Sequence, residues 1–266
     1  MPSFVIITVH LNNYEGFVKT VTSVLPFLER EQNSKWIIKD GNSIISTVEK
    51  IQGLIAQINS RKIELIKSED SGIYDAMNQT LDYLDDTDTA LFLNAGDTLS
   101  DDFLERFSLE EANQDVLFSD TILKLGNRRI VAPLKLDYAY LLGKTINHQS
   151  LLIKAKLLKK YRFKTNYSIV ADWVQLFEIL KNEKVKIQKL AYPISIYEGG
   201  GFSEQQDELR LSQRQSYLEF IYSDWELESL SELKRLRQRK WFDFVIKALG
   251  SPKRSKAIEL LARTIK

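Results

Sequence analysis

The chain has 266 residues, of which 44% are hydrophobic and 27% are charged, and its formal net charge is +1. This length suits one large α/β domain, or such a domain with an extension, and this composition is typical of a soluble globular protein. The chain contains no cysteine, which excludes disulfides, zinc–thiolate sites and a cysteine nucleophile. No apolar run approaches the roughly 20 residues that a membrane-spanning helix needs.

Strand-like and helix-like segments alternate over the first hundred residues. The apolar run 3–9 is typical of a buried parallel strand. Because it begins so early, it leaves no room for a secretory signal, and we expect a cytoplasmic protein. Apolar residues at helical spacing follow over 14–30, where Pro26 is expected to kink or end the helix. Further strands are expected at 36–38, 63–66 and 90–93, and further helices at 48–58 and 73–84.

This alternation predicts an α/β fold with a Rossmann-like, mostly parallel central sheet and helices on both faces. The second hundred residues have a looser order. There we expect helices at 101–107 and 170–180, strands at 116–118 and 186–195, an apolar strand within 146–153, and a hairpin over 121–131 that turns at Gly126-Asn127. We expect one domain over 1–202 and a basic, helical C-terminal extension over 203–266.

Positive charge is concentrated at the C-terminus. Residues 230–266 hold 11 basic and 3 acidic residues, a local charge of +8, which leaves −7 for the rest of the chain. An apolar cluster lies among these cations: Trp241, Phe242, Val245, Ile246 and Leu249. The pattern fits an interfacial helix on anionic lipid. The alternative is a pair of helices that packs on the domain or on a second subunit.

Small polar and acidic residues follow four of the expected strands. These residues are Asn12, Asp40, Asp70 and Asp97. The carboxyl ends of parallel strands meet at one edge of the sheet, where α/β proteins bind ligands, so one crevice would collect all four. A carboxylate at that edge can hold a divalent metal, and a metal can hold phosphates.

Seven short motifs carry a resemblance to a known family. They are ITV-x-x-NN at 7–13, KDGNS at 39–43, SED-SGIYDAMNQT at 68–80, FLNAGD at 92–97, NHQS at 147–150, ADW at 171–173 and YEGGGFS at 197–203. Together they resemble the family 2 glycosyltransferases of the GT-A fold. The string SGIYDAMNQT is similar to the subgroup found in bacterial surface-polysaccharide clusters. The resemblance covers about residues 3–203.

The resemblance implies an inverting, metal-dependent glycosyltransferase of the hexosyltransferase type (EC 2.4). A nucleotide-sugar donor, with a UDP-sugar as the first choice, would give its sugar to a hydroxyl of a glycan or a lipid-linked saccharide. The nucleotide-binding half would span about 1–100 and the acceptor half about 101–202. No nucleic acid partner is expected. The extension would place the protein at the inner face of the cell membrane as a peripheral protein, or would form a homodimer.

The same resemblance places the donor at the ends of the first four strands. Asp40 would bind the base, with Thr8 and Asn12 in the same pocket, and the alternative for Asp40 is an Asp-Gly turn. Leu11 stands where the family often has an aromatic residue, so the identity of the nucleotide is open. Further donor contacts are expected from five positions: Asp70, Gly72, Asn78, Asn94 and Ala95.

The run Asn94-Ala95-Gly96-Asp97 stands where the family has Asp-x-Asp. Asp97 is therefore the one acidic ligand expected for Mn²⁺ or Mg²⁺, and metal binding would depend on the nucleotide. Asp101 and Asp102 are expected to cap the next helix. Asp172 is the expected catalytic general base. Its alternative role is an ordinary helix N-cap.

Four residues are further candidates for donor or acceptor contacts. His148 would touch the metal, the diphosphate or the acceptor, or would be a structural histidine. Trp173 would offer a sugar-stacking face or lie in the core. Gly200 and Ser203 belong to a glycine-rich segment that would form either a loop over the donor phosphates or a plain connection.

Two other functions remain as alternatives. A nucleotidyltransferase on a similar sheet normally has a basic, glycine-rich loop after its first strand, whereas this chain has HLNNYEG there. A non-catalytic carbohydrate-binding or assembly partner on the same scaffold is the other alternative.

Overall fold

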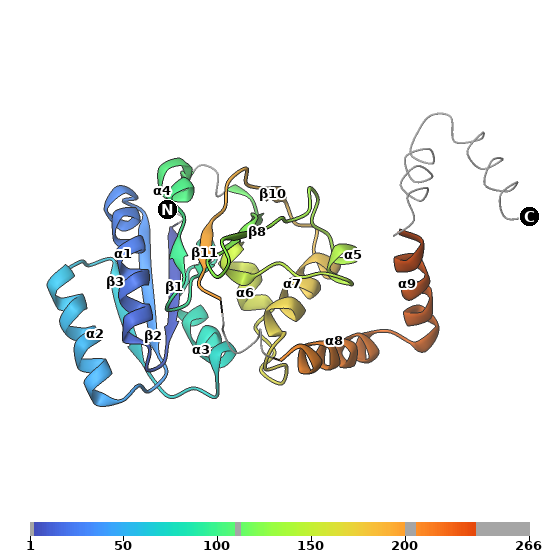
Figure 1. Ribbon diagram of the computed structural model, residues 1–266, viewed down its shortest axis with the longest axis horizontal. Helices are drawn as coiled ribbons and strands as arrows, with labels where there is room; N and C mark the ends of the chain where they lie inside the picture. Colours follow the sequence, from blue (N-terminus) through green and yellow to red (C-terminus); the bar gives the residue numbers. More distant parts are fainter. Residues whose placement is uncertain (1–2, 110–112, 200–205, 238–266) are drawn as a thin grey trace, which may run out of the picture. The chain divides into compact units, whose positions relative to one another are not determined.

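The computed structural model describes residues 3–109, 113–199 and 206–237, with side chains through residue 230 (Figure 1). The chain divides into two compact units, residues 1–213 and 214–266. The expected boundary between domains at 202 and 203 stays a prediction. The described residues of the first unit hold both sheets and all the candidate site residues except Gly200 and Ser203.

The first unit contains a seven-stranded sheet with the strand order β10-β6-β9-β4-β1-β2-β3. Strand β9 runs antiparallel to its neighbours β4 and β6, and the other pairs are parallel. This arrangement confirms the predicted α/β fold class with a mostly parallel central sheet. The strands are β1 (Phe4–His10), β2 (Ser34–Asp40), β3 (Ile63–Lys67), β4 (Thr89–Phe92), β6 (Val116–Phe118), β9 (Leu151–Lys154) and β10 (Ile187–Lys189).

Helices lie on both sides of strands β1–β3, as the alternation predicts. Figure 1 shows α1 and α2 on one side and α3 on the other, where α3 packs against β1 and β2. Helix α1 continues through Pro26 to Arg30, so the expectation that Pro26 ends it is wrong. The helices of the first half are α1 (Tyr14–Arg30), α2 (Ile45–Ile58), α3 (Ile73–Thr80), the 3₁₀ turn η1 (Leu81–Tyr83) and α4 (Asp101–Arg106).

The second half of this unit has shorter helices. They are α5 (Tyr138–Leu141), the 3₁₀ turn η3 (His148–Ser150), α6 (Ala155–Lys160) and α7 (Ala171–Asn182). Helix α4 is capped by Ser100, whose Oγ accepts a hydrogen bond from the backbone N–H of Phe103 at 3.1 Å. The expectation that Asp101 and Asp102 form the cap is therefore wrong. Both carboxylates lie in the first turn instead, where they interact favourably with the helix dipole.

Every residue of β1 is buried, which explains its nearly continuous apolar sequence. Phe4 is fully buried, and its ring lies 5.0 Å from Phe27, 6.0 Å from Phe103 and 5.2 Å from Phe107. Burying one such side chain contributes about 1.5–3 kcal/mol. This aromatic cluster fixes α1 and α4 against the sheet and so positions the loops at the ends of the strands.

A second, four-stranded sheet has the order β5-β11-β7-β8. Its strands are β5 (Thr98–Leu99), β7 (Thr121–Leu123), β8 (Arg128–Ile130) and β11 (Ser195–Tyr197). Strands β7 and β8 pair antiparallel, which confirms the hairpin within 121–131, and Gly126 and Asn127 take positive φ angles at its turn. The single strand expected over 186–195 is wrong, because the chain leaves the large sheet after Lys189 and joins the small sheet at Ser195.

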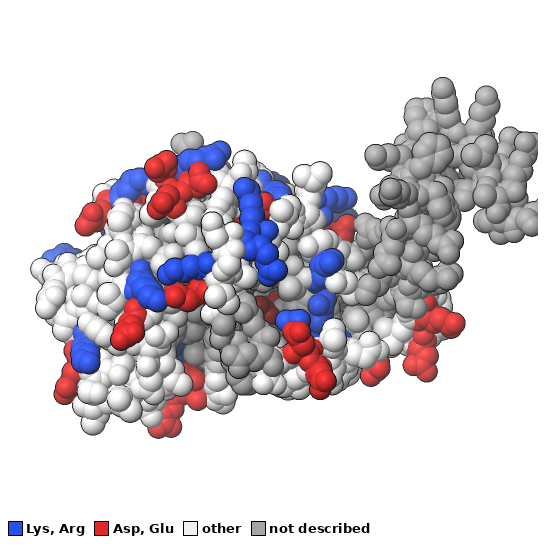
Figure 2. Space-filling view, viewed as in Figure 1, with Lys and Arg blue, Asp and Glu red and all other residues white. Residues whose placement is uncertain are grey.

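Two further helices follow, α8 (Asp207–Ile221) and α9 (Asp224–Arg237). Residues 238–266, which include the apolar cluster from Trp241 to Leu249, lie outside the described residues. Within the described ranges, none of the helices has the length and hydropathy that crossing a membrane requires. Figure 2 shows basic and acidic side chains interspersed over the visible face of the described residues.

Candidate functional site

The candidate site lies at the carboxyl edge of the large sheet. Asp40 is the last residue of β2, and Asn94 and Asp97 follow β4 within five residues. Strand β9 runs in the opposite direction, so the residues that precede it arrive at this same edge. His148 in η3 is one of these residues, and the reversed strand therefore brings it to the ends of the parallel strands.

Four side chains from four separate segments form a connected line at this edge. The amide Nδ2 of Asn94 lies 3.0 Å from Nε2 of His148. The other ring nitrogen of His148, Nδ1, lies 3.2 Å from Oδ2 of Asp172. The hydroxyl of Tyr74 lies 3.0 Å from Oδ1 of Asp172. The line thus joins the end of β4 to the first turns of α3 and α7.

Asp172 lies in the first turn of α7, but the N-cap of that helix is Val170. The alternative of an ordinary N-cap is therefore wrong for Asp172. Its Oδ1 accepts a hydrogen bond from the backbone N–H of Trp173 at 2.8 Å, and its side chain remains 19% exposed. A partly exposed carboxylate at a helix N-terminus is stabilised in its ionised form by the helix dipole.

Tyr74 stays protonated beside this carboxylate. Burial raises the pKa of Tyr74 well above its usual value, and the negative charge of Asp172 raises it further. The neutral hydroxyl has two acceptors within reach, since the carbonyl of Ile169 lies 2.9 Å away. Tyr74 was not singled out from the sequence, and nothing local marks it, because its partner is 98 residues away.

Asp97 is almost fully buried, with 4% of its surface exposed. Its Oδ1 accepts a hydrogen bond from the backbone N–H of Glu198 at 3.0 Å. Burial raises the pKa of Asp97 from 3.8 to about 6, and the hydrogen bond from Glu198 offsets part of this rise. The loop before it is held by Thr20 of α1, whose hydroxyl donates to the carbonyl of Asp97 at 2.8 Å and accepts from the N–H of Gly96 at 3.0 Å.

Two oxygen ligands suitable for a hard cation occur together in this loop. One is the carboxylate of Asp97. The other is the side-chain oxygen Oδ1 of Asn94, which is buried and has no hydrogen-bond partner among the described residues. Carboxylate and amide oxygens suit Mg²⁺ and Mn²⁺. Over the described ranges, no three His, Asp or Glu side chains gather as a metal cluster, so a cation here would complete its coordination with oxygens of the bound ligand.

Asp40 is buried and holds the loop that follows β2. Its Oδ2 lies 3.1 Å from Nδ1 of His10, and its Oδ1 accepts a hydrogen bond from the N–H of Ser43 at 2.8 Å. His10 was given no chemical role from the sequence. The register between β1 and β2 would have identified His10, because His10 and Asp40 are directly paired at the ends of these two strands. A groove of about 510 Å³ opens beside this pair, lined by residues that include Asp40, Asn42, Ser43, Lys67 and Glu69.

Asp70 is tied to β2 by a buried lysine. Lys39 is fully buried, and its Nζ donates to Oδ2 of Asp70 at 2.9 Å, to the carbonyl of Ser68 at 2.7 Å and to that of Asp40 at 3.0 Å. Gly41 permits this arrangement, because a Cβ at that position would lie 2.5 Å from Oδ2 of Asp70. Lys39 was missed by sequence reasoning, since a lysine inside KDGNS looks like an exposed residue.

Three residues that were expected to contact ligands are used by the fold instead. Thr8 is fully buried, donates to the carbonyl of Leu93 and accepts from the indole of Trp36. Asn78 uses both ends of its amide on the backbone of Phe163. Trp173 is 2% exposed and donates its indole N–H to the carbonyl of Leu141, which identifies it as a core residue. These contacts engage the hydroxyl of Thr8 and both ends of the amide of Asn78 in the fold, and burial covers the indole of Trp173.

The other expected site residues lie in the loops at the edge of the sheet. Asn12 accepts the N–H of Ile44 with Oδ1 at 2.8 Å, so it joins the first loop to the second. Ala95 accepts a hydrogen bond from the side chain of Asn13 at 3.2 Å. Gly72 is the N-cap of α3, with a φ of 133° that favours glycine. Gly200 and Ser203 lie outside the described residues.

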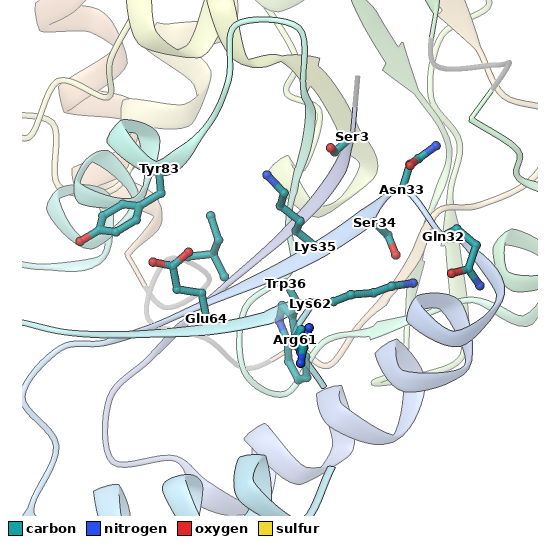
Figure 3. A pocket seen from close by; sticks show the side chains of 11 residues that line it. Ser3, Gln32, Asn33, Ser34, Lys35, Trp36, Arg61, Lys62, Glu64 and Tyr83 are labelled. Atoms are coloured by element: carbon teal, nitrogen blue, oxygen red, sulfur yellow. The ribbon is translucent and has the colours of Figure 1, made fainter. Parts of the chain in front are cut away.

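A second hollow, of about 380 Å³, lies at the opposite edge of the sheet, where β1, β2 and β3 begin (Figure 3). Lys62 extends along it and donates to the carbonyls of Leu28 and Glu31 at the end of α1. The labelled side chains in Figure 3 come from the amino ends of the strands and the residues just before them, except Tyr83, which lies in η1. Because ligands of open α/β sheets bind at the carboxyl edge, the site at Asn94, His148 and Asp172 is the stronger candidate.

Comparison with curated proteins identifies similar glycosyltransferases. A PGL/p-HBAD biosynthesis glycosyltransferase of Mycobacterium bovis is 28% identical over 173 residues, which cover 63% of this chain and 66% of that protein. A Mycobacterium tuberculosis protein described in the same words has the same identity and coverage. The match thus spans slightly less than two thirds of the length of these relatives. No family model matches the chain.

Solved structures share the fold at low sequence identity. TarS 1–349 of S. aureus, in complex with UDP, has a TM-score of 0.61 at 13% identity, covering 83% of this chain and 72% of that one. The mannosyltransferase PcManGT of Pyrobaculum calidifontis, in complex with GDP-Man and Mn²⁺, has a TM-score of 0.61 at 12% identity, covering 99% of this chain and 79% of that one. The chain is therefore similar in fold to TarS and PcManGT, and in sequence to proteins described as glycosyltransferases.

Proposed function

We propose that this protein is an inverting glycosyltransferase of the family 2 type. It transfers a hexosyl group from a nucleotide sugar to a hydroxyl of a glycan or a lipid-linked saccharide in surface-polysaccharide or glycolipid synthesis. The relatives described as glycosyltransferases and the folds of TarS and PcManGT support the reaction class. The observation that carries the proposal is the line from Asn94 through His148 to Asp172, which spans the carboxyl edge of the sheet.

Asp172 is the general base in this proposal. Inverting transfer is a single displacement at the anomeric carbon, and it needs a carboxylate that takes the acceptor proton on the face opposite the leaving diphosphate. Asp172 is partly exposed, is held by three hydrogen-bonding groups and stands at a helix N-terminus. These hydrogen bonds hold the carboxylate in one orientation. Asn94 lies at the other end of the line, on the side proposed for the donor.

Asp97 and Asn94 would hold a divalent cation, Mn²⁺ or Mg²⁺. When bound, the cation supplies positive charge that stabilises the departing diphosphate. Asp97 must be ionised for this role, and its pKa of about 6 leaves it ionised at neutral pH. The buried oxygen of Asn94, which has no hydrogen-bond partner among the described residues, supports the same assignment, because such an atom is costly unless a ligand satisfies it.

The nucleotide base is proposed to lie beside Asp40 and the groove next to it, with the loops of Asn12, Asp70 and Gly72 around the ribose and diphosphate. The UDP of TarS and the GDP-Man of PcManGT support a nucleotide-sugar donor, and we take a UDP-sugar as the first candidate. The extension over 203–266 is proposed to bind a membrane surface at its periphery or a second copy of the chain.

A panel of donors tests the proposal. The thermal unfolding midpoint is measured with UDP-, GDP-, dTDP- and CDP-sugars, each with and without Mn²⁺. A ligand at about 100 times its Kd stabilises the folded state by about 2.7 kcal/mol, which raises the midpoint of a domain of this size by about 5–10 °C. We expect one nucleotide class to give this shift, and to give less of it without the metal.

The second arm of the test is Asp172→Asn. This variant is expected to keep the nucleotide-induced shift and to lose sugar transfer to an acceptor. Full transfer by Asp172→Asn would exclude Asp172 as the base. The absence of a shift with all four nucleotide classes would refute a nucleotide-sugar transferase.

A further inference from the structure

His148 stands between the two ends of the proposed site and touches both. It is one of two histidines in the chain. On one side the imidazole faces an amide, the Nδ2 of Asn94 at 3.0 Å, and on the other a carboxylate, the Oδ2 of Asp172 at 3.2 Å. Its side chain is 20% exposed, so both contacts form at the border of the site and not in the deep core.

These two partners leave one consistent arrangement for a neutral imidazole. A neutral imidazole has one nitrogen that donates and one that accepts. The ionised carboxylate of Asp172 can only accept, so Nδ1 must carry the proton. Nε2 is then an acceptor and takes a hydrogen bond from the amide N–H of Asn94. The opposite tautomer would place the lone pair of Nδ1 against Oδ2 of Asp172, where the two acceptors repel.

The same arrangement fixes the amide of Asn94. Because its Nδ2 donates to His148, its Oδ1 is directed away from the ring, and this oxygen is the buried atom without a hydrogen-bond partner among the described residues. A rotation of the amide by half a turn would put Oδ1 against the lone pair of Nε2. The tautomer of His148 thus decides which atom of Asn94 faces the ring and which faces away from it.

We propose that His148 is a positioning residue that orients Asp172 through Nδ1 and the amide of Asn94 through Nε2. One imidazole ring thereby positions a group on the acceptor side of the reaction, Asp172, and a group on the donor side, Asn94. The inference rests on the proposed function, which assigns Asp172 to the acceptor and Asn94 to the donor. The predicted positions of the protons on His148 do not depend on any activity.

Two substitutions separate the two contacts. In His148→Asn, the shorter amide reaches the position of Nδ1 and can donate to Asp172, but nothing reaches Asn94. In His148→Gln, the longer amide reaches the position of Nε2 and can accept from Asn94, but the hydrogen bond to Asp172 is lost. Each variant is the matched control of the other, because both replace the ring by a neutral amide.

We expect opposite kinetic signatures from these variants. His148→Gln should lower kcat about 10–100-fold, the range found when a partner that orients a functional group is removed, with nucleotide affinity unchanged. His148→Asn should keep kcat within a few-fold and weaken nucleotide binding about tenfold, since one lost hydrogen bond is of that order. Equal losses of kcat and affinity in both variants, in proportion to a lowered unfolding midpoint, would show a merely structural histidine and overturn the proposal.

Imidazole NMR supplies a readout that needs no turnover. Long-range ¹H–¹⁵N spectra distinguish a protonated from an unprotonated ring nitrogen, and with two histidines in the chain, the spectrum of His148→Gln assigns the signals. We expect the neutral imidazole of His148 to carry its proton on Nδ1. A proton on Nε2 alone would overturn the inference. A wild-type protein that binds no nucleotide would refute the proposed function instead, and the tautomer would still decide the role of His148.

Discussion

Replacing Asp97 by asparagine is expected to stabilise the protein above neutral pH while it abolishes metal-dependent nucleotide binding. Burial raises the pKa of Asp97 from 3.8 to about 6, so the folded state binds this proton more tightly than the unfolded state does. The stabilisation from this proton is complete below about pH 4 and is lost as the pH rises through about 6. The pKa difference corresponds to about 3 kcal/mol, at 1.36 kcal/mol per unit.

An asparagine at this position never ionises, and its side-chain oxygen can still accept the hydrogen bond from the N–H of Glu198. In urea unfolding with a chelator present, Asp97→Asn should match the wild type at about pH 4 and exceed its free energy of unfolding by up to about 3 kcal/mol at about pH 8. The exposed Asp101 offers a matched control, and Asp101→Asn should show little dependence on pH. A stability difference for Asp97→Asn that is the same at both pH values would refute the reasoning.

Titration of the Asp97→Asn variant with UDP tests the second part of this prediction, the loss of metal-dependent nucleotide binding. Affinity that depends on Mn²⁺ in the wild type should become independent of Mn²⁺ in the variant. Unchanged metal dependence would remove Asp97 from the cation site.

Three further substitutions test contacts that hold the site. Lys39→Met leaves the carboxylate of Asp70 without its buried cation and should lower the free energy of unfolding by about 3–5 kcal/mol, as measured in urea; a loss below about 1 kcal/mol would mean that Asp70 turns to solvent. Asn78→Ala removes two hydrogen bonds to the backbone of Phe163 and should cost about 2 kcal/mol, with nucleotide affinity retained; a selective loss of affinity would return Asn78 to the donor site. Gly96→Ala should cost about 1–3 kcal/mol because φ is 112° there, although a Cβ would make only ordinary van der Waals contacts, at 3.9 Å from Cβ of Glu198 and 4.0 Å from Nδ2 of Asn13; no change by differential scanning calorimetry would contradict this.

The first half of the fold was readily predicted from the sequence because its signals are local. Helix α1 begins at Tyr14 and ends at Arg30, as the spacing of apolar residues predicts, and β1 through β4 appear where the apolar runs lie. The strand expected over 186–195 was wrong for a non-local reason. Its apolar content is real, but its two ends pair with different sheets, and no local pattern records which sheet a residue joins.

The residue types of the site and their places at strand ends were predicted from the sequence, but the contacts between them were not. The polar residues after each strand were found because strand ends are local features, and Asp172 was found through the family resemblance. The partners that orient them lie far along the chain: Tyr74 and Asp172 are 98 residues apart, and Lys39 and Asp70 are 31 apart. Thr8 and Asn78 stand in motifs at the right places, yet they serve the fold, because a motif fixes the position of a residue but not the direction of its side chain.

The reversed strand β9 also has a consequence for the order in which the protein is made. It fills the place between β4 and β6, and these two strands have β9 as their shared neighbour in the sheet. A nascent chain that has emerged only as far as residue 145 therefore lacks the strand that joins β4 to β6, and strand edges without a partner are liable to pair with other chains. Pairing of β9 joins β4 to β6 and, in the same step, carries His148 to Asn94. During synthesis, the gap between β4 and β6 is thus closed as His148 reaches Asn94, and β10 completes the sheet afterwards at the other edge of β6.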